Sequence, residues 1–241
     1  MKYINLLAFF AMVFMNYLAA TLPLNNTTTG QVSNLYPTLF TPAGITFSIW
    51  IVIYLLMFIF LEVQVFEKRH ANTAKIGWYF VLSCLFNIGW LFAWHYRLIG
   101  LSTVVMFLLL TSLVIANRNL SQDGSRLAKA AFGIYLGWIC VAAIANVSIF
   151  LVSLGWNGFG IPEPFWAALM ILATIVLTGI LVLQLKNPFI ALSVIWGLTG
   201  IFWARLELHP VLAYFAVGGA IIIAATTIIL LIHIRKMTAK N

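Results

Sequence analysis

Residues 36–66 read YPTLFTPAGITFSIWIVIYLLMFIFLEVQVF, a proline-bearing loop followed by a long apolar run. The loop contains Pro37 and Pro42, Gly44 follows as a hinge, and Trp50 and Tyr54 lie four residues apart in the run. Residues four apart share one face of a helix, and about 20 apolar residues suffice to cross a bilayer. The stretch therefore predicts a hinged loop leading into a membrane helix with two large amphipathic rings on one face.

The composition extends this interpretation to the whole chain of 241 residues. Apolar residues make up 63% and charged residues 7%, whereas soluble domains carry about 25% charged residues. The net charge of +8 arises in short connectors and not in a basic helix or stripe, so no nucleic-acid-binding surface is predicted. Cys84 and Cys140 lack a pairing or metal motif. Because no P-loop, nucleophile elbow or carboxylate pair is present, we expect neither an enzyme nor a metal site.

Eight apolar runs predict an all-α, polytopic membrane helix bundle with eight transmembrane helices. They cover residues 4–21, 45–66, 76–96, 99–117, 130–153, 165–185, 188–204 and 210–233. The first run admits a second interpretation, because Lys2, the apolar stretch and Leu18-Ala19-Ala20 are also typical of a cleaved signal peptide. We favour its retention as a membrane helix.

The basic residues between the runs predict the orientation of the bundle. With the N-terminus inside, Arg97 and Arg205 lie outside, and the inner side holds Lys2, Lys68, Arg69, Lys75, Arg118, Arg126, Lys129, Lys186, Arg235, Lys236 and Lys240. Cytoplasmic loops carry an excess of lysine and arginine. We therefore expect cytoplasmic termini and an outer connector, residues 22–44, that covers the bundle. Since no organelle-targeting segment is evident, we expect a bacterial plasma membrane.

Two helix faces carry side chains that suit a ligand pocket. Ser83, Asn87, Trp90 and Trp94 fall within a stripe about 60° wide, and Tyr135, Trp138, Ala142 and Asn146 lie within about 80° on the helix over 130–153. Aromatic walls with a few polar groups are typical of a pocket for a flat hydrophobic ligand. The pocket residues we predict are Trp50, Tyr54, Asn87, Trp90, Tyr135, Trp138 and Asn146.

The same residues have a structural interpretation. Asparagine inside a membrane helix often joins neighbouring helices, and tryptophan near the end of a span often anchors it at the membrane interface. We assign the anchoring role to Trp78, Trp94, Trp156, Trp166 and Trp203. Gly133 and Gly137 lie opposite the Tyr135 face, and this spacing predicts close approach of another backbone.

Three motifs carry a family resemblance. They are Phe47-Ser48-Ile49-Trp50 leading to Tyr54, Phe86-Asn87-Ile88-Gly89-Trp90, and Ile134-Tyr135-Leu136-Gly137-Trp138 ahead of Ala142 and Ala145-Asn146. In this order, residues 1–153 resemble the tryptophan-rich sensory protein family, TspO, also called the translocator protein family. The resemblance implies a five-helix bundle over 1–153, with residues 154–241 as a three-helix C-terminal extension.

The resemblance also implies a function. Family members bind porphyrins and other tetrapyrroles, some bind sterols or synthetic aromatic ligands, and many form homodimers. Here the 22–44 connector lacks tryptophan and Ile134 replaces the family's proline, so the ligand need not be a porphyrin and no certain cofactor is implied. We expect non-covalent binding of a flat hydrophobic ligand, for sensing or transport. The alternatives are a secondary transporter or permease of unknown solute, and a structural membrane subunit.

Overall fold

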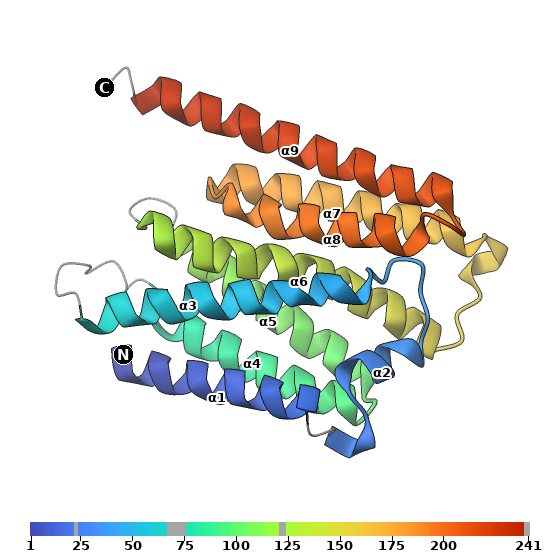
Figure 1. Ribbon diagram of the computed structural model, residues 1–241, viewed down its shortest axis with the longest axis horizontal. Helices are drawn as coiled ribbons and strands as arrows, with labels where there is room; N and C mark the ends of the chain where they lie inside the picture. Colours follow the sequence, from blue (N-terminus) through green and yellow to red (C-terminus); the bar gives the residue numbers. More distant parts are fainter. Residues whose placement is uncertain (22–23, 67–75, 121–123, 239–241) are drawn as a thin grey trace.

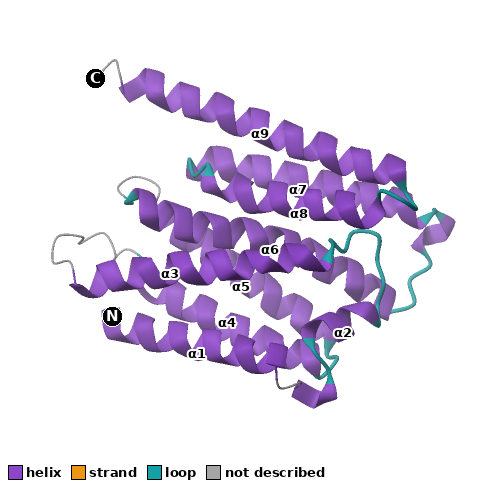
Figure 2. Cartoon of the chain, in the orientation of Figure 1, coloured by secondary structure: helices purple, strands orange, loops and turns teal. Residues whose placement is uncertain are grey.

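The computed structural model describes residues 1–21, 24–66, 76–120 and 124–238. In these ranges every regular element is helical (Figure 2). The long helices are α1 (Lys2–Thr21), α3 (Ile49–Phe66), α4 (Gly77–His95), α5 (Ile99–Leu120), α6 (Arg126–Ser153), α7 (Glu163–Leu185), α8 (Phe189–Arg205) and α9 (Pro210–Thr238). The connectors contain α2 (Thr29–Asn34) and the short 3₁₀ turns η1 (Leu24–Asn26), η2 (Gly44–Ser48) and η4 (Gly158–Gly160).

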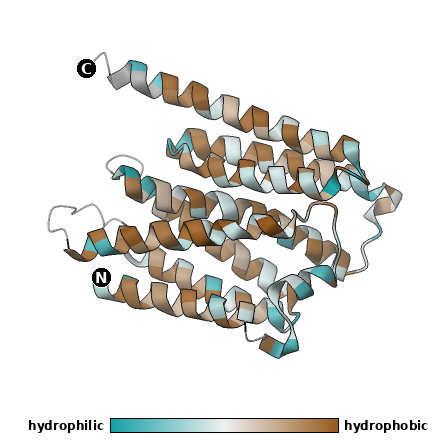
Figure 3. Cartoon of the chain, in the orientation of Figure 1, coloured by the Kyte–Doolittle hydropathy of each residue, from teal (hydrophilic) through white to brown (hydrophobic). Residues whose placement is uncertain are grey.

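The predicted all-α membrane bundle is confirmed. Seven of the described helices are long and apolar enough to cross a membrane, and α8, with 17 residues, is shorter. Their outward faces remain apolar, as Leu7, Phe14 and Ile51 show, and hydrophilic residues gather mainly towards helix ends and in connectors (Figure 3). Apolar outer faces on this many long helices suit a lipid environment and not water. The chain is therefore an integral membrane protein.

Five helices close into a ring, in the order α1, α3, α6, α5 and α4, with each in contact with the next and α4 in contact with α1 (Figure 1). Fully buried side chains from all five fill the interior, among them Met12, Met57, Cys84, Leu109 and Tyr135. We call this unit the five-helix ring.

The other three helices form an outer layer on α6. Helix α8 lies along α6, α9 lies on α8 and α7, and α7 also contacts α6 (Figure 1). Helix α6 therefore belongs to both parts, and the division at residue 153 stays a prediction. Helix α1 begins and α9 ends at the same end of the bundle, as an even number of spans requires. Which side of the membrane this end faces also stays a prediction.

The contact between α6 and α8 depends on glycine. A Cβ atom on Gly137 would collide with the carbonyl oxygen of Ile190 and with Ser193 Oγ, and one on Gly133 would meet the side chains of Asn187 and Phe189. Two helices approach this closely only where no side chain separates their backbones. The predicted packing through the glycine face is confirmed, and its partner is α8.

Buried amides reinforce this contact at the opposite end from α2. Asn187, in the turn between α7 and α8, donates through Nδ2 to Asn117 Oδ1 at 2.9 Å and to the carbonyl of Lys129 at 2.9 Å. Asn117 in turn donates to the carbonyl of Phe132 at 3.0 Å. An amide without a hydrogen-bond partner in an apolar interior is costly. These hydrogen bonds therefore hold α5, α6 and α8 in place relative to one another.

Candidate functional site

The side chains of Trp50 and Tyr54 lie on the side of α3 that faces α6, its neighbour in the five-helix ring. They stack on each other with centroids 5.5 Å apart and an interplanar angle of 27°. Trp50 also meets the ring of Tyr135 on α6 edge-on, at 5.7 Å and 66°. The four-residue spacing therefore places both rings on one face, as predicted, and that face points towards α6. Both side chains are half-buried, whereas Tyr135 is fully buried.

A buried polar pair joins this aromatic group. Asn87 of α4 accepts a hydrogen bond through Oδ1 from Asn16 Nδ2 of α1 at 2.7 Å. The hydroxyl of Tyr135 donates to the sulfur of Met12 at 3.7 Å and lies beside Asn87. Sulfur is a weak acceptor, so the Tyr135 hydroxyl can exchange it for a stronger acceptor at little cost. We call Asn16, Trp50, Tyr54, Asn87 and Tyr135 the aromatic–amide cluster.

Trp90 and Asn146 form a second, separate group. Trp90 Nε1 donates to Asn146 Oδ1 at 2.8 Å, and Asn146 Nδ2 donates to Thr103 Oγ1 at 2.7 Å and to Ser102 Oγ at 3.1 Å. The amide of Asn146 thus uses its oxygen and both of its N–H donors within the protein. In this structure the pair joins α4, α5 and α6, which is the structural role that the sequence left open for a buried asparagine.

The ring contact of Trp138 is with neither group. Its indole is 2% exposed, and it meets the ring of Phe47 in η2 edge-on at 5.5 Å and 86°. It therefore connects α6 to the turn that precedes α3. The seven predicted residues thus divide into the aromatic–amide cluster, the Trp90–Asn146 pair, and Trp138 beneath η2.

Sequence reasoning missed Asn16, the α1 member of the cluster, and Met12, whose sulfur accepts from Tyr135. The signal was present, because Asn5, Met12 and Asn16 fall on one stripe about 40° wide at helical periodicity. Asn5 is also buried, and donates to Gln64 on α3 at 3.2 Å. Two amides on one face of an apolar helix indicate polar contacts with neighbouring helices.

The first described part of the connector covers the end of α4. Thr28 and Gln31 form a capping box at the start of α2, Trp94 Nε1 donates to the carbonyl of Thr29 at 3.1 Å, and Asn25 Nδ2 donates to the carbonyl of His95 at 2.9 Å. Trp94 is 3% exposed and stacks on Trp90 at 5.3 Å. Its prediction as an interface anchor is therefore wrong, because the connector and not lipid covers it.

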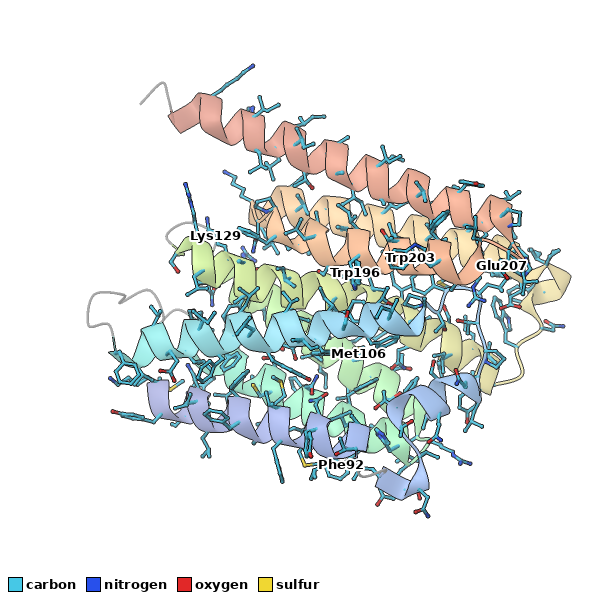
Figure 4. All side chains as sticks on the ribbon, viewed as in Figure 1. Phe92, Met106, Lys129, Trp196, Trp203 and Glu207 are labelled. Atoms are coloured by element: carbon cyan, nitrogen blue, oxygen red, sulfur yellow. The ribbon has the colours of Figure 1, made fainter. Side chains whose placement is uncertain are left out.

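The second part, residues 37–46, is anchored to the outer layer, and we call it the proline segment. Arg205 at the end of α8 donates to the carbonyls of Leu39, Thr38 and Thr41 at 3.0, 3.0 and 3.1 Å. Trp196 of α8, labelled in Figure 4, donates to the carbonyl of Thr46 at 2.8 Å. The connector therefore spans the five-helix ring and the outer layer at this end of the bundle.

A cavity of about 370 Å³ lies beside the proline segment, at the junction of α6 and α7. We call it the end cavity. Its lining consists of Pro37, Thr38, Leu39, Phe40, Ser148, Leu151, Val152, Trp156, Asn157, Gly158, Ile161, Glu163, Trp166, Ala167 and Met170. None of the seven predicted residues belongs to this lining. Among the described residues, no group of three metal-ligating side chains comes together.

Comparison with known families supports the resemblance and extends it. The family described as TSPO-like protein matches residues 2–229, and so includes the outer layer as well as the five-helix ring. Comparisons with curated proteins and with solved structures found no match. Since the match covers almost the whole sequence, the chain belongs to the TSPO-like protein family.

Proposed function

We propose that this protein binds a flat hydrophobic ligand non-covalently in the five-helix ring, at the aromatic–amide cluster, without catalysing a reaction. The observation that carries the proposal is the convergence of α1, α3, α4 and α6 on one group of aromatic rings and amides. Aromatic faces give such a ligand apolar contact, and amide and hydroxyl groups fix its orientation. A tetrapyrrole or a similar conjugated ring system fits this chemistry.

Trp50 and Tyr54 are the side chains that a ligand would contact first. Both are half-buried, whereas Asn87 and Tyr135 behind them are at most 1% exposed. A ligand that enters between α3 and the rest of the ring would insert between the stacked pair and Tyr135, and would contact the rings on both sides. Asn87 and the Tyr135 hydroxyl would then bond its polar edge. Such binding would serve sensing or transport.

Titration of the purified protein with haem and protoporphyrin, followed by quenching of tryptophan fluorescence, tests the proposal. We expect Asn87→Ala and Trp138→Ala to weaken binding, the first by about tenfold because one hydrogen bond to the ligand is lost. Trp138→Ala would act indirectly, by releasing η2 and the start of α3 from α6.

The matched pair Trp50→Phe and Trp78→Phe controls for the loss of one fluorophore. Trp78 lies on α4 and is 58% exposed, far more than the half-buried Trp50. We expect weaker porphyrin binding only for Trp50→Phe. The site assignment fails if Asn87→Ala, Trp138→Ala and Trp50→Phe all bind porphyrin as tightly as the unmodified protein.

A further inference from the structure

The end cavity is a separate site from the aromatic–amide cluster. Its wall comes from the last turns of α6, the connector over residues 156–161, the first turns of α7 and the proline segment. Of these, α7 and the 156–161 connector belong to the outer layer, and α6 is shared between the outer layer and the five-helix ring. At about 370 Å³ the cavity lies near the lower end of the range for small-molecule pockets, which is about 300–1,000 Å³.

Two tryptophans build one side of the cavity, and the connector is shaped to hold them. Trp156 and Trp166 meet with centroids 4.7 Å apart and an interplanar angle of 63°. Trp166 Nε1 donates to the carbonyl of Gly158 at 3.0 Å. Gly158 has a positive φ of 65°, and a Cβ atom there would lie 2.9 Å from Trp166. Only glycine combines this backbone conformation with this close approach, so the indole is seated in a fixed place.

The polar side of the cavity is a carboxylate held by the proline segment. Glu163, the first residue of α7, accepts a hydrogen bond through Oε1 from the backbone N–H of Leu39 at 2.9 Å. Arg205 interacts electrostatically with Glu163 and binds the carbonyls on both sides of this contact. An ionised carboxylate has about four acceptor positions and no donor, and Leu39 uses one of them. Among the described residues that line the cavity, Glu163 is the one that carries a charge.

We propose that the end cavity binds a small, flat ring compound that carries a hydrogen-bond donor, with the ring against Trp156 and Trp166 and the donor on the Glu163 carboxylate. The apolar lining, which includes Phe40, Leu151 and Met170, excludes water from the ring. Because the cavity is small, the site takes one or a few fused rings and not a macrocycle. This inference does not depend on the proposed tetrapyrrole function.

A pair of probes that differ only in the donor tests this site. 2-Naphthol carries a hydroxyl donor and 2-methoxynaphthalene does not, while their ring systems are the same. Binding is measured by titration of the full chain in lipid nanodiscs, with empty nanodiscs subtracted to remove partition into lipid. Because Glu163 is solvent-exposed, its charge is partly screened, and we expect 2-naphthol to bind about three- to tenfold more tightly. Equal binding of the two probes would overturn the assigned role of Glu163.

Two kinds of variant locate the binding. Glu163→Gln keeps an acceptor for Leu39 but removes the charge, so 2-naphthol should bind about three- to tenfold more weakly while 2-methoxynaphthalene is unaffected. Ala167→Leu fills the cavity from α7 and should abolish binding of both probes. Ala173→Leu makes the same change at an exposed position of the same helix, and should leave binding unchanged.

A replacement variant and two cross-controls distinguish binding in the end cavity from misfolding and from binding at the aromatic–amide cluster. If Ala167→Leu fails to fold, Met170→Phe also narrows the cavity and replaces it in the test. Asn87→Ala should not change 2-naphthol binding, and Met170→Phe should not change porphyrin binding. The end cavity is rejected if 2-naphthol binds the folded cavity variant as it binds the unmodified protein, or if Asn87→Ala alone abolishes its binding.

Discussion

Replacing Gly137 by leucine is expected to lower the stability of the folded protein severely. The position of its Cβ is occupied by the carbonyl of Ile190 and by Ser193 Oγ. Ser193 cannot turn away without loss, because its hydroxyl donates to the carbonyl of Ile134 at 2.8 Å. The backbones of α6 and α8 would therefore have to separate. Overpacking that forces backbone to move costs about 1–3 kcal/mol and occasionally more, and we expect this change at the upper end because the clash is with backbone.

Thermal unfolding in detergent, followed by circular dichroism, measures this effect. Gly179→Leu on α7 is the matched control, since nothing lies within 4 Å of a Cβ atom built at Gly179. We expect the Gly137 variant to melt several degrees below the unmodified protein, and the Gly179 variant to melt close to it. Equal melting temperatures for both variants would show that the α6–α8 contact tolerates a side chain, contrary to the structure.

Replacing Arg205 by methionine is expected to release the proline segment from α8. The change removes the donors that hold the carbonyls of Thr38, Leu39 and Thr41, while the methionine retains much of the apolar stem. Hydrogen bonds to charged groups contribute about 1.5–3 kcal/mol each. Because Arg205 is only partly buried, we expect the free energy of local opening to fall by about 2 kcal/mol in total.

Amide hydrogen exchange reports this opening directly. The N–H groups of Leu39 and Ala43 are hydrogen-bonded to Glu163 and to the carbonyl of Gly200, and both should exchange roughly 30-fold faster in the variant. Arg205→Lys should restore part of the protection, because lysine keeps the charge but lacks the planar fork of donors. Arg97→Met removes the other basic residue predicted on this side, at an exposed position. If it accelerated exchange at Leu39 equally, charge and not the Arg205 contacts would be the cause.

Long apolar runs made the membrane helices easy to predict. The run over 45–66 became η2 and α3 from Gly44 to Phe66, and the short run over 188–204 became α8 from Phe189 to Arg205. These elements depend on local hydropathy and length, which a sequence states directly. The predicted faces are confirmed as well: Trp50 and Tyr54 share one side of α3, and the Gly133–Gly137 face packs on a backbone.

Contacts between distant segments were harder to predict. Asn146 and Trp90 were expected in one chamber with Trp50, but Ser102 and Thr103 of α5 draw Asn146 into a separate network. Trp94 was expected at the lipid interface, but α2 covers it. In each case the side chain was assigned to the correct helix face, and the residue that meets it lies on an element whose position only tertiary packing sets.

The sequence by itself determined that this chain is a membrane bundle, where its helices run and which faces carry rings, amides and glycines. Helical periodicity and the cost of exposing backbone to lipid leave little other choice. Only the tertiary structure decided that α8 is the partner of the glycine face, that Arg205 and Trp196 hold the proline segment, and that Trp156, Trp166 and Glu163 meet at one cavity. These contacts join residues far apart in the chain, and their partners follow from how eight similar apolar helices pack together, which no local pattern records.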